Sequence, residues 1–589
     1  MADQQLPTIY ELVSQAGVKR DGTDFDSQFW NDALWVRFQR GRPRKMGGYR
    51  YISDLLYGPV RAMYLDSRAA GTTVHSFSQW GIEQLLIDSG GLLSSLTDRT
   101  PAAFVANSLY TWQAASMFQS GGAGTPTLVA SASPDSDALS SDVAGPVYSG
   151  DITLTTPMTP VQDGAGVITV SGGVCALQPF IFLYGSNGLI RNSNPNDVSV
   201  GSGWTTGGAN KASTANVAGS KIVKGLAMRG GGQSPAGVFW ALDALIKVNY
   251  VGGTTLWTYD TISDDVTILS KSCVVEYDNA FYWVGTDRFY VYNGIVQELP
   301  NPMNLNWFFD NLNFAQRQKV WALKVPRFGE IWWFFPTGTS TECNAAVIFN
   351  VREKLWYDTA IDRTAGAPAR VYPRPLMAQN GDVTSAVKYA PLTGVFTYGE
   401  SVVGLTSGAT ATVSKTSSTQ LNLSNVIGSF IVGETIQDTG HGGSDTGTVT
   451  ALAFDQQLST IWDHEKGVDV VNRAGTSAID SRIESNNLNW LTGSPVTAQG
   501  QGGNFQFQLS RVEPDFVIAG SMSLAVNGKS FANSVANLSD PISFNGSTEY
   551  VDLREQRRLL TLIFRSNEIG GDFQMGRILL TVEPGDERG

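Results

Sequence analysis

Hydrophobic residues are grouped in short runs of β-branched and aromatic side chains, and most runs end at Gly, Asn or Asp. Such runs predict short β-strands joined by tight turns. Helical periodicity is confined to two segments, a loose one at residues 6–15 and an aromatic one at residues 304–317. The pattern therefore predicts an all-β chain with few short helices.

The predicted hairpins recur along the chain. From position 180 onward the repeat is about 40–60 residues with roughly four strands per unit, which is the spacing of β-propeller blades. A single four-stranded sheet cannot bury both of its faces, whereas sheets stacked around an axis bury them against each other. The sequence thus predicts a β-propeller of about six blades, and a set of β-sandwiches is the alternative.

Two stretches interrupt this rhythm. Residues 120–173 are rich in Gly, Ala, Ser and Thr and are expected to form an insertion. Residues 396–402 (FTYGESV) return as residues 430–436 (FIVGETI), which is an internal duplication with an offset of 34. The segments 34–52 and 573–584 are candidates for pairing between the two chain ends. The predicted organisation is an N-terminal arm and basic hairpin at 1–52, blades at 53–393, an inserted duplicated β module at 394–454, and remaining blade strands with a C-terminal β segment at 455–589.

The charge balance limits the classes of partner. The 589 residues include 41 Lys or Arg and 53 Asp or Glu, which gives a net charge of −12. A protein that grips nucleic-acid phosphates over much of its surface is expected to be basic instead. The three cysteines have no C-x-x-C spacing, and we expect neither a disulfide framework nor a zinc ribbon. No secretory signal or apolar membrane span is expected, so the chain is predicted to stay in a cytoplasm or in a particle assembled there.

The sequence has few candidates for catalysis. The three histidines, His75, His441 and His464, lack metal-binding spacing, and neither a G-x-S-x-G elbow nor a phosphate-binding loop is present. Residues 197–204 (DVSVGSGW) faintly match the Asp-box of propeller sialidases, but a turn at a blade edge is the simpler interpretation. We predict no catalytic residues, no metal, no cofactor and no enzyme activity.

A basic cluster near the N-terminus is the candidate interaction site. Because alternate residues of a strand face opposite sides, the six charges need not form one patch. Docking to an adaptor or a neighbouring protein is favoured over a solvated face or DNA, since the whole chain is acidic. The six residues are Arg37, Arg40, Arg42, Arg44, Lys45 and Arg50.

Residues 20–49, 234–250 and, most specifically, 274–359 resemble structural proteins of tailed bacteriophages. The duplicated module at 394–454 resembles inserts found in phage virion proteins. Together these segments make the chain resemble the tail nozzle, or tail hub, proteins of short-tailed phages. That family has no catalytic residues to transfer to this sequence.

The resemblance implies a β-propeller-bearing subunit of a ring, typically hexameric, in the virion tail. The ring would lie below the portal and adaptor proteins, extend the DNA channel, retain packaged DNA without sequence-specific binding and seat tail fibres or tail tip proteins. An acidic channel wall repels DNA and keeps it mobile, which agrees with the net charge. The alternatives are a receptor- or glycan-binding tail protein and, less favoured, a propeller glycosidase.

Overall fold

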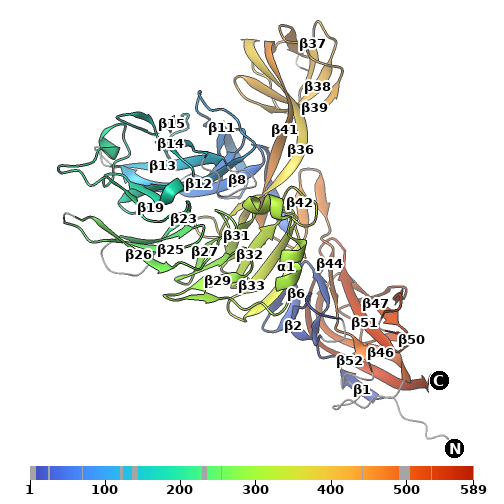
Figure 1. The fold of residues 1–589 in the computed structure, drawn as a ribbon. Coiled ribbons are helices and arrows are strands. Elements are labelled where there is room, and N and C mark those ends of the chain that lie inside the picture. Colours follow the sequence, from blue (N-terminus) through green and yellow to red (C-terminus); the bar gives the residue numbers. More distant parts are fainter. Residues whose placement is uncertain are drawn as a thin grey trace, which may run out of the picture. The chain divides into compact units, whose positions relative to one another are not determined.

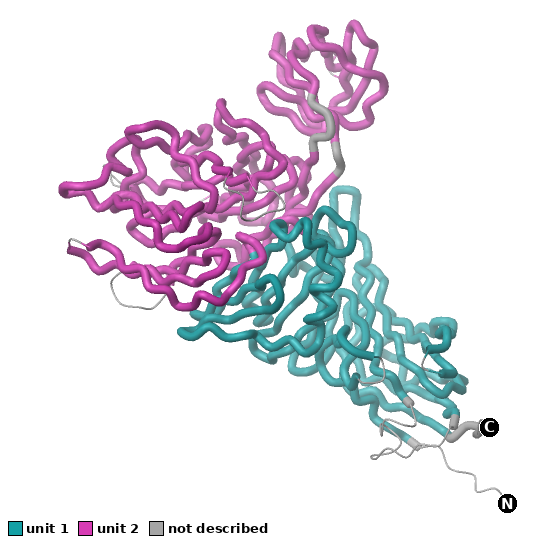
Figure 2. Tube along the Cα trace, viewed as in Figure 1, with its two compact units in different colours: residues 1–50, 273–362, 463–589 teal, residues 51–272, 363–462 magenta. Residues whose placement is uncertain are grey.

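The structure, a computed structural model, describes residues 8–23, 27–68, 70–119, 124–134, 143–228, 235–253, 255–440, 442–489, 505–531 and 533–587. Regular structure in these ranges is almost entirely β (Figure 1). The chain forms two compact units, which are coloured separately in Figure 2. Unit 1 consists of residues 1–50, 273–362 and 463–589, and unit 2 of residues 51–272 and 363–462.

Within the described residues, six antiparallel sheets follow one another in chain order: five have four strands, and the sheet of β12–β15 has β18 (Thr169–Val170) as a fifth, paired with β14. In each sheet the strands pair mainly with their neighbours in sequence, because short turns favour hairpins. The four sheets of unit 2 are β8–β11 (Val60–Arg68, Gly71–Ser78, Ile82–Ile87, Leu93–Asp98), β12–β15 (Tyr110–Gln119, Thr125–Pro134, Gly145–Asp151, Thr159–Pro160), β19–β22 (Gly173–Leu177, Phe180–Tyr184, Leu189–Asn192, Ser213–Asn216) and β23–β26 (Ile222–Ala227, Ala236–Ala241, Leu245–Tyr250, Trp257–Ser263). The two sheets of unit 1 are β27–β30 (Val275–Tyr277, Ala280–Val284, Phe289–Tyr292, Val296–Glu298) and β31–β34 (Trp321–Val325, Glu330–Phe335, Ala345–Asn350, Leu355–Ala360).

Successive sheets of unit 2 share hydrophobic cores. Phe77 and Trp112 join the first two sheets, with ring centroids 5.3 Å apart. Phe182 and Trp257 join the last two, 4.8 Å apart and edge to face. The sheets are therefore buried on both faces, as propeller blades are. The predicted all-β, propeller-type fold is confirmed.

Another sheet of unit 2 combines segments that are far apart in the sequence. It contains β7 (Tyr49–Tyr57), β35 (Ala365–Ala367), β36 (Leu376–Thr393) and β41 (Thr446–His464). Its core joins that of β8–β11 through Leu56, Val74, Leu85 and Ile461. The long strands β36 and β41 also enter and leave the duplicated module (Figure 1).

The rest of unit 1 contains two larger sheets, which contact each other through Phe516, Phe544 and Phe564. The first contains β1 (Thr8–Glu11), β5 (Val36–Gln39), β6 (Arg42–Lys45), β46 (Phe505–Ala519), β50 (Val551–Arg557) and β52 (Asp572–Glu587). The second contains β4 (Asp32–Leu34), β44 (Ser481–Glu484), β45 (Leu488–Asn489), β47 (Ser521–Lys529), β48 (Asn537–Leu538), β49 (Ile542–Asn545) and β51 (Leu559–Ser566). The remaining short strands are β2 (Gln15–Val18), β3 (Phe29–Trp30), β16 (Gln162–Asp163), β17 (Gly166–Val167), β42 (Val470–Asn472) and β43 (Gly475–Ser477).

The two predicted helices had different outcomes. Residues 304–317 contain helix α1 (Leu305–Asn311) and most of a 3-10 helix (Phe314–Lys319), so this prediction is confirmed. The helix predicted at 6–15 was wrong, because Thr8–Glu11 is strand β1 and pairs antiparallel with β52. Backbone pairing with a strand from the opposite chain end outweighs the weak local preference.

Two other predicted segments have a different place in the structure. The described residues of 120–173 supply β13, β14, β15 and β18 of a five-stranded sheet rather than an insertion. Their small side chains fit because the neighbouring backbone is close: a Cβ on Gly145 would lie 1.5 Å from the Ala132 carbonyl oxygen. The segments 34–52 and 573–584 do pair, at Arg44 and Gln574, but in the six-stranded sheet of unit 1 that contains β6 and β52 and not in a blade.

Candidate functional site

The basic hairpin that the sequence singled out spans β5 and β6, and its charges do not form one surface. Arg37 is only 1% exposed, and Lys45 is buried with its Nζ donating to the Gly571 carbonyl at 2.7 Å. Arg40 and Arg42 are exposed, whereas Arg44 is half-buried. The docking role stays a prediction for the exposed residues, while Arg37 and Lys45 are engaged inside the chain.

Arg37 is the centre of a buried ionic cluster. Its Nε donates to Glu330 Oε1 at 2.9 Å, and its Nη1 donates to Glu465 Oε2 at 2.9 Å. The guanidinium also lies over the Phe328 ring, 3.6 Å from the centroid. Tyr357 donates its hydroxyl hydrogen to Glu330 at 2.7 Å, which satisfies the carboxylate further. The cluster fixes the hairpin to the β31–β34 sheet.

Burial and neighbouring charges shift the pKa values of this cluster in opposite directions. Burial alone would lower the pKa of the Arg37 guanidinium, but the charges of Glu330 and Glu465 outweigh it and raise that pKa. Burial raises the pKa of the Glu330 carboxyl, and Arg37 opposes the rise. Arg37 therefore remains charged and serves a structural purpose.

The remaining basic residue and the histidines also have places in the fold. Arg50 is half-buried at the start of β7. His75 is buried with its Nδ1 3.5 Å from Arg99 Nη1, and buried His464 stacks on Tyr49 with ring centroids 5.0 Å apart. His441 lies outside the described residues. The two described histidines are thus packed within the protein.

The duplicated module has the clearest local symmetry in the chain. Its own strands are β37 (Ser401–Gly404), β38 (Thr410–Thr416), β39 (Gln420–Ile427) and β40 (Thr435–Asp438). Strand β36 pairs with both β39 and β41, so the order β36–β39–β38–β37–β40–β41 closes into a barrel. Val403 pairs directly with Gln437, its counterpart at an offset of 34. Because β37 and β40 are antiparallel, a local two-fold axis passes through that pair.

The two repeats make equivalent hydrogen bonds in the turns before β37 and β40. Glu400 accepts from the Thr397 N–H at 2.8 Å, and Glu434 accepts from the Ile431 N–H at 2.6 Å. Gly399 and Gly433 occupy the same turn position with positive φ values of 86° and 92°, which Gly adopts without strain. The sequence duplication is therefore a duplication of structure.

Large apolar side chains of the module are exposed to solvent. Val395 is 70% exposed, and Tyr398, Ile431 and Val432 are exposed in or beside these two turns. The other exposed apolar residues of the described module are Leu405, which follows β37, and Val426 and Ile427 at the end of β39. Sequence reasoning missed these residues. The available signal was the pair of turns FTYGE and FIVGE, which have apolar residues where turns are normally polar.

A second buried ion pair joins the module to the rest of unit 2. Lys415, at the end of β38, contacts Glu83 on β10, and both side chains are at most 5% exposed. The Lys415 ammonium also lies 3.3 Å from the centroid of the Tyr57 ring. Burial lowers the pKa of the Lys415 ammonium and raises that of the Glu83 carboxyl, while each charge opposes the other's shift. The sequence analysis did not identify this pair.

The Glu434 turn gives a prediction about pH. Burial alone would raise the pKa of Glu434, but the N–H groups of Ile431 and Ser407 outweigh it and lower that pKa. The stabilisation is fully present above the unfolded-state pKa of about 4.3 and is lost as pH falls through the lower folded-state pKa. We expect the Glu434→Gln variant to lose less stability than the wild type between about pH 5 and 3. Thermal unfolding at stepped pH tests this, and identical pH profiles for the two proteins would contradict it.

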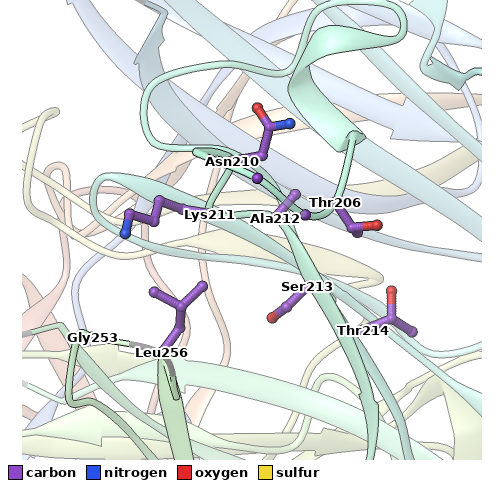
Figure 3. Close-up of a pocket in the computed structure, with 10 residues that line it drawn as sticks. Thr206, Asn210, Lys211, Ala212, Ser213, Thr214, Gly253 and Leu256 are labelled. Carbon is purple, nitrogen blue, oxygen red and sulfur yellow. The ribbon is translucent and has the colours of Figure 1, made fainter.

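A polar hollow of about 680 Å³ lies between the segment before β22 and the turn between β25 and β26. Figure 3 shows the 206–214 segment and Leu256 facing each other across it. The rim is held by the buried Asn194 amide, whose Oδ1 accepts from the Lys211 and Ala212 N–H groups at 2.6 and 2.8 Å. The lining residues are Thr206, Gly207, Gly208, Asn210, Lys211, Ala212, Ser213, Thr214, Gly253 and Leu256.

The chemistry of this hollow is that of hydroxyls, amides and one ammonium group, without a carboxylate. The nearby Asp-box-like segment is a turn, since Asp197 accepts from the Ser199 N–H at 2.8 Å and Trp204 is buried under Arg191. A smaller hollow of about 210 Å³ in unit 1 includes Arg565 and Glu568. Neither hollow contains a pair of carboxylates.

Among the described residues there is no group of three His, Cys, Asp or Glu side chains arranged to hold a metal ion. No helix within the described ranges has the length and hydropathy needed to cross a membrane.

The chain matches no protein-family model and no curated protein. Similar solved structures include BamB from Moraxella catarrhalis, at 10% identity and a TM-score of 0.28, covering 70% of this chain and 99% of that one. An ancestral GH74 enzyme is 9% identical with a TM-score of 0.34, covering 60% of this chain and 50% of that one. An exo-β-1,3-galactanase from Phanerochaete chrysosporium, with β-1,3-galactotriose, is 8% identical with a TM-score of 0.26, covering 91% and 99%.

These comparisons correct one prediction. The sequence analysis predicted no enzyme activity, but the similar solved structures include glycoside hydrolases of two kinds. That exclusion was wrong, because it treated the absence of familiar catalytic motifs as sufficient, and glycosidase carboxylates have no fixed sequence spacing. At these identities the likeness concerns the fold and transfers neither a substrate nor a site.

Proposed function

We propose that the protein is a structural subunit of a short-tailed phage tail, in which copies form a nozzle or hub ring, typically of six. The ring lies below the portal and adaptor, extends the DNA channel, retains the packaged DNA and seats tail fibres or tail tip proteins. Its place is the virion tail, assembled in the host cytoplasm.

The observation that carries the proposal is the match between resemblance and structure at residues 274–359. This stretch, the most specific of the resembling segments, spans nearly all of the two sheets β27–β30 and β31–β34 together with helix α1. Its aromatic residues are core residues: Trp283 and Trp333 are fully buried, and Phe308 of α1 packs against Phe335 at 4.5 Å. The resembling residues are thus those that build a complete piece of scaffold.

The electrostatics support the same function. The chain has a net charge of −12, and a ring multiplies that charge around its channel. Arg37 and Lys45 are engaged inside the protein, so fewer cations of the basic hairpin remain to hold phosphates. A channel protein benefits from this, because each phosphate contact adds affinity and slows sliding DNA.

The test is symmetry-resolved electron cryomicroscopy of the source particles, with the density traced against this sequence. We expect a ring of about six copies below the portal, around the DNA, with Arg40 and Arg42 facing the adaptor or a neighbouring subunit. Density at the tips of peripheral fibres would contradict the proposal and favour receptor binding. Release of reducing sugar from host polysaccharide by the purified protein would instead favour hydrolysis.

A further inference from the structure

The 394–452 segment of the duplicated module has few exposed charges. Residues 394–452 include five charged side chains, and four of these are buried. The exception is Asp445, whose carboxylate accepts from the Val395 N–H at 3.2 Å. The buried four are Glu400, Lys415, Glu434 and Asp438. The exposed surface therefore combines hydroxyl groups with apolar turn residues.

The charge of this surface restricts its partner. Nucleic acid and anionic surfaces are held by several cations together, whereas Lys415 is buried against Glu83 and Lys388 of β36 is the lone exposed cation on the described part of the barrel. Copies of a chain with a net charge of −12 repel one another, but salt screens charges that lie more than about 8 Å apart. Two charge-poor modules therefore meet with little repulsion and can remove apolar area from water. A second copy of this chain is the partner that fits.

The local symmetry gives each copy two related contact faces. The first-turn face contains Val395 and Tyr398, and the second-turn face contains Leu405, Ile431 and Val432. Leu405 belongs to the second face because its N–H donates to the Thr435 carbonyl, next to that turn. Because the axis passes through the middle of the β37–β40 pair, the two faces lie at opposite ends of that pair.

We propose that the module joins copies of this chain, with the first-turn face of one copy docked against the second-turn face of the next. A closed ring needs two different, complementary faces on every subunit. A duplicated module supplies two such faces from one sequence repeat. This inference rests on the proposed function, since it names the contact that holds the ring together.

The first test compares full-length wild type with Tyr398→Asp and Val432→Asp by sedimentation velocity over about 1–100 µM. We expect the wild type to associate and each variant to raise the association Kd at least about 100-fold, since a buried unpaired carboxylate opposes contact. An equimolar mixture of the two variants retains one intact pair of faces and should stop at dimers. Val251→Asp is the matched control, because Val251 is an exposed apolar residue in the β25–β26 turn.

The second test uses cross-linking. Cys175, Cys273 and Cys343 are buried and form no disulfide, so cysteines introduced at exposed turns will react selectively. Tyr398→Cys mixed with Val432→Cys should give disulfide-linked dimers under oxidation, whereas either variant alone should give few.

The outcomes separate this inference from the proposed function. Rings or oligomers that persist in Tyr398→Asp and Val432→Asp overturn the module contact and leave the tail function standing. A wild type that remains monomeric and uncross-linked overturns the contact, while the particle images still decide the function. Binding of the wild type, but not the variants, to neutral phosphatidylcholine vesicles, without self-association, would show that the turns serve a membrane and would also overturn the contact.

Discussion

Replacement of Arg37 by Ala is expected to lower the free energy of unfolding by about 3–5 kcal/mol, because it leaves buried carboxylates without their counter-charge. Glu330 is fully buried and receives two hydrogen bonds from Arg37, at 2.9 and 3.2 Å. Glu465 loses its two bonds from the same guanidinium. Denaturant unfolding of the purified full-length variant measures the loss.

Two variants control this prediction. Arg42→Ala removes an exposed guanidinium from the same hairpin and should change stability by less than about 0.5 kcal/mol. Arg37→Lys keeps the charge but cannot pair with two carboxylates in a planar fork, so it should recover only part of the loss. A variant Arg37→Ala as stable as Arg42→Ala would show that the cluster contributes little.

Replacement of Lys415 by Met is expected to cost about 3–5 kcal/mol by leaving the Glu83 carboxylate buried and unpaired. The loss should appear in the module and in the β8–β11 sheet, since Lys415 belongs to the module and Glu83 to β10. Hydrogen exchange measured by mass spectrometry should show faster exchange in β38 and β10 than in β31–β34.

The double variant Glu83→Gln, Lys415→Met provides the control. Gln retains an acceptor for the Tyr57 N–H, which donates to Glu83 at 2.5 Å, and removes the unpaired charge. Most of the stability should therefore return. If the double variant is no more stable than Lys415→Met, shape and not charge governs this contact.

The sequence predicted those features that depend on neighbouring residues. Short apolar runs ending at turn residues predicted the four-stranded sheets, and the aromatic segment at 304–317 predicted helix α1. The duplication at 396–402 and 430–436 was evident in the sequence, and in the structure Glu400 and Glu434 make equivalent hydrogen bonds. In these elements the local pattern and the local geometry agree, because the partners are close in the chain.

Pairing of the distant segments 34–52 and 573–584 was predicted, but side-chain pairs between distant residues were not. Arg37 was expected at a surface because it belongs to a basic cluster, but its carboxylate partners lie 293 and 428 residues away. Lys415 and Glu83 are separated by 332 residues. The Asn194 amide that holds the polar rim looks, in sequence, like an ordinary turn residue. A single sequence contains no signal for these side-chain pairs.

The paths by which the chain enters and leaves the module have an evolutionary consequence. Thr393 of β36 lies beside Thr446 of β41, with their hydroxyl oxygens 2.7 Å apart, and Gln379 lies beside Trp462 further down the same two strands. The two ends of the insertion are therefore adjacent, and a short turn between them would restore a plain hairpin. Recombination at one site can therefore add, remove or exchange the module and leave the rest of unit 2 unchanged. Of the changes this fold allows, an exchange of the module disturbs the remaining structure least.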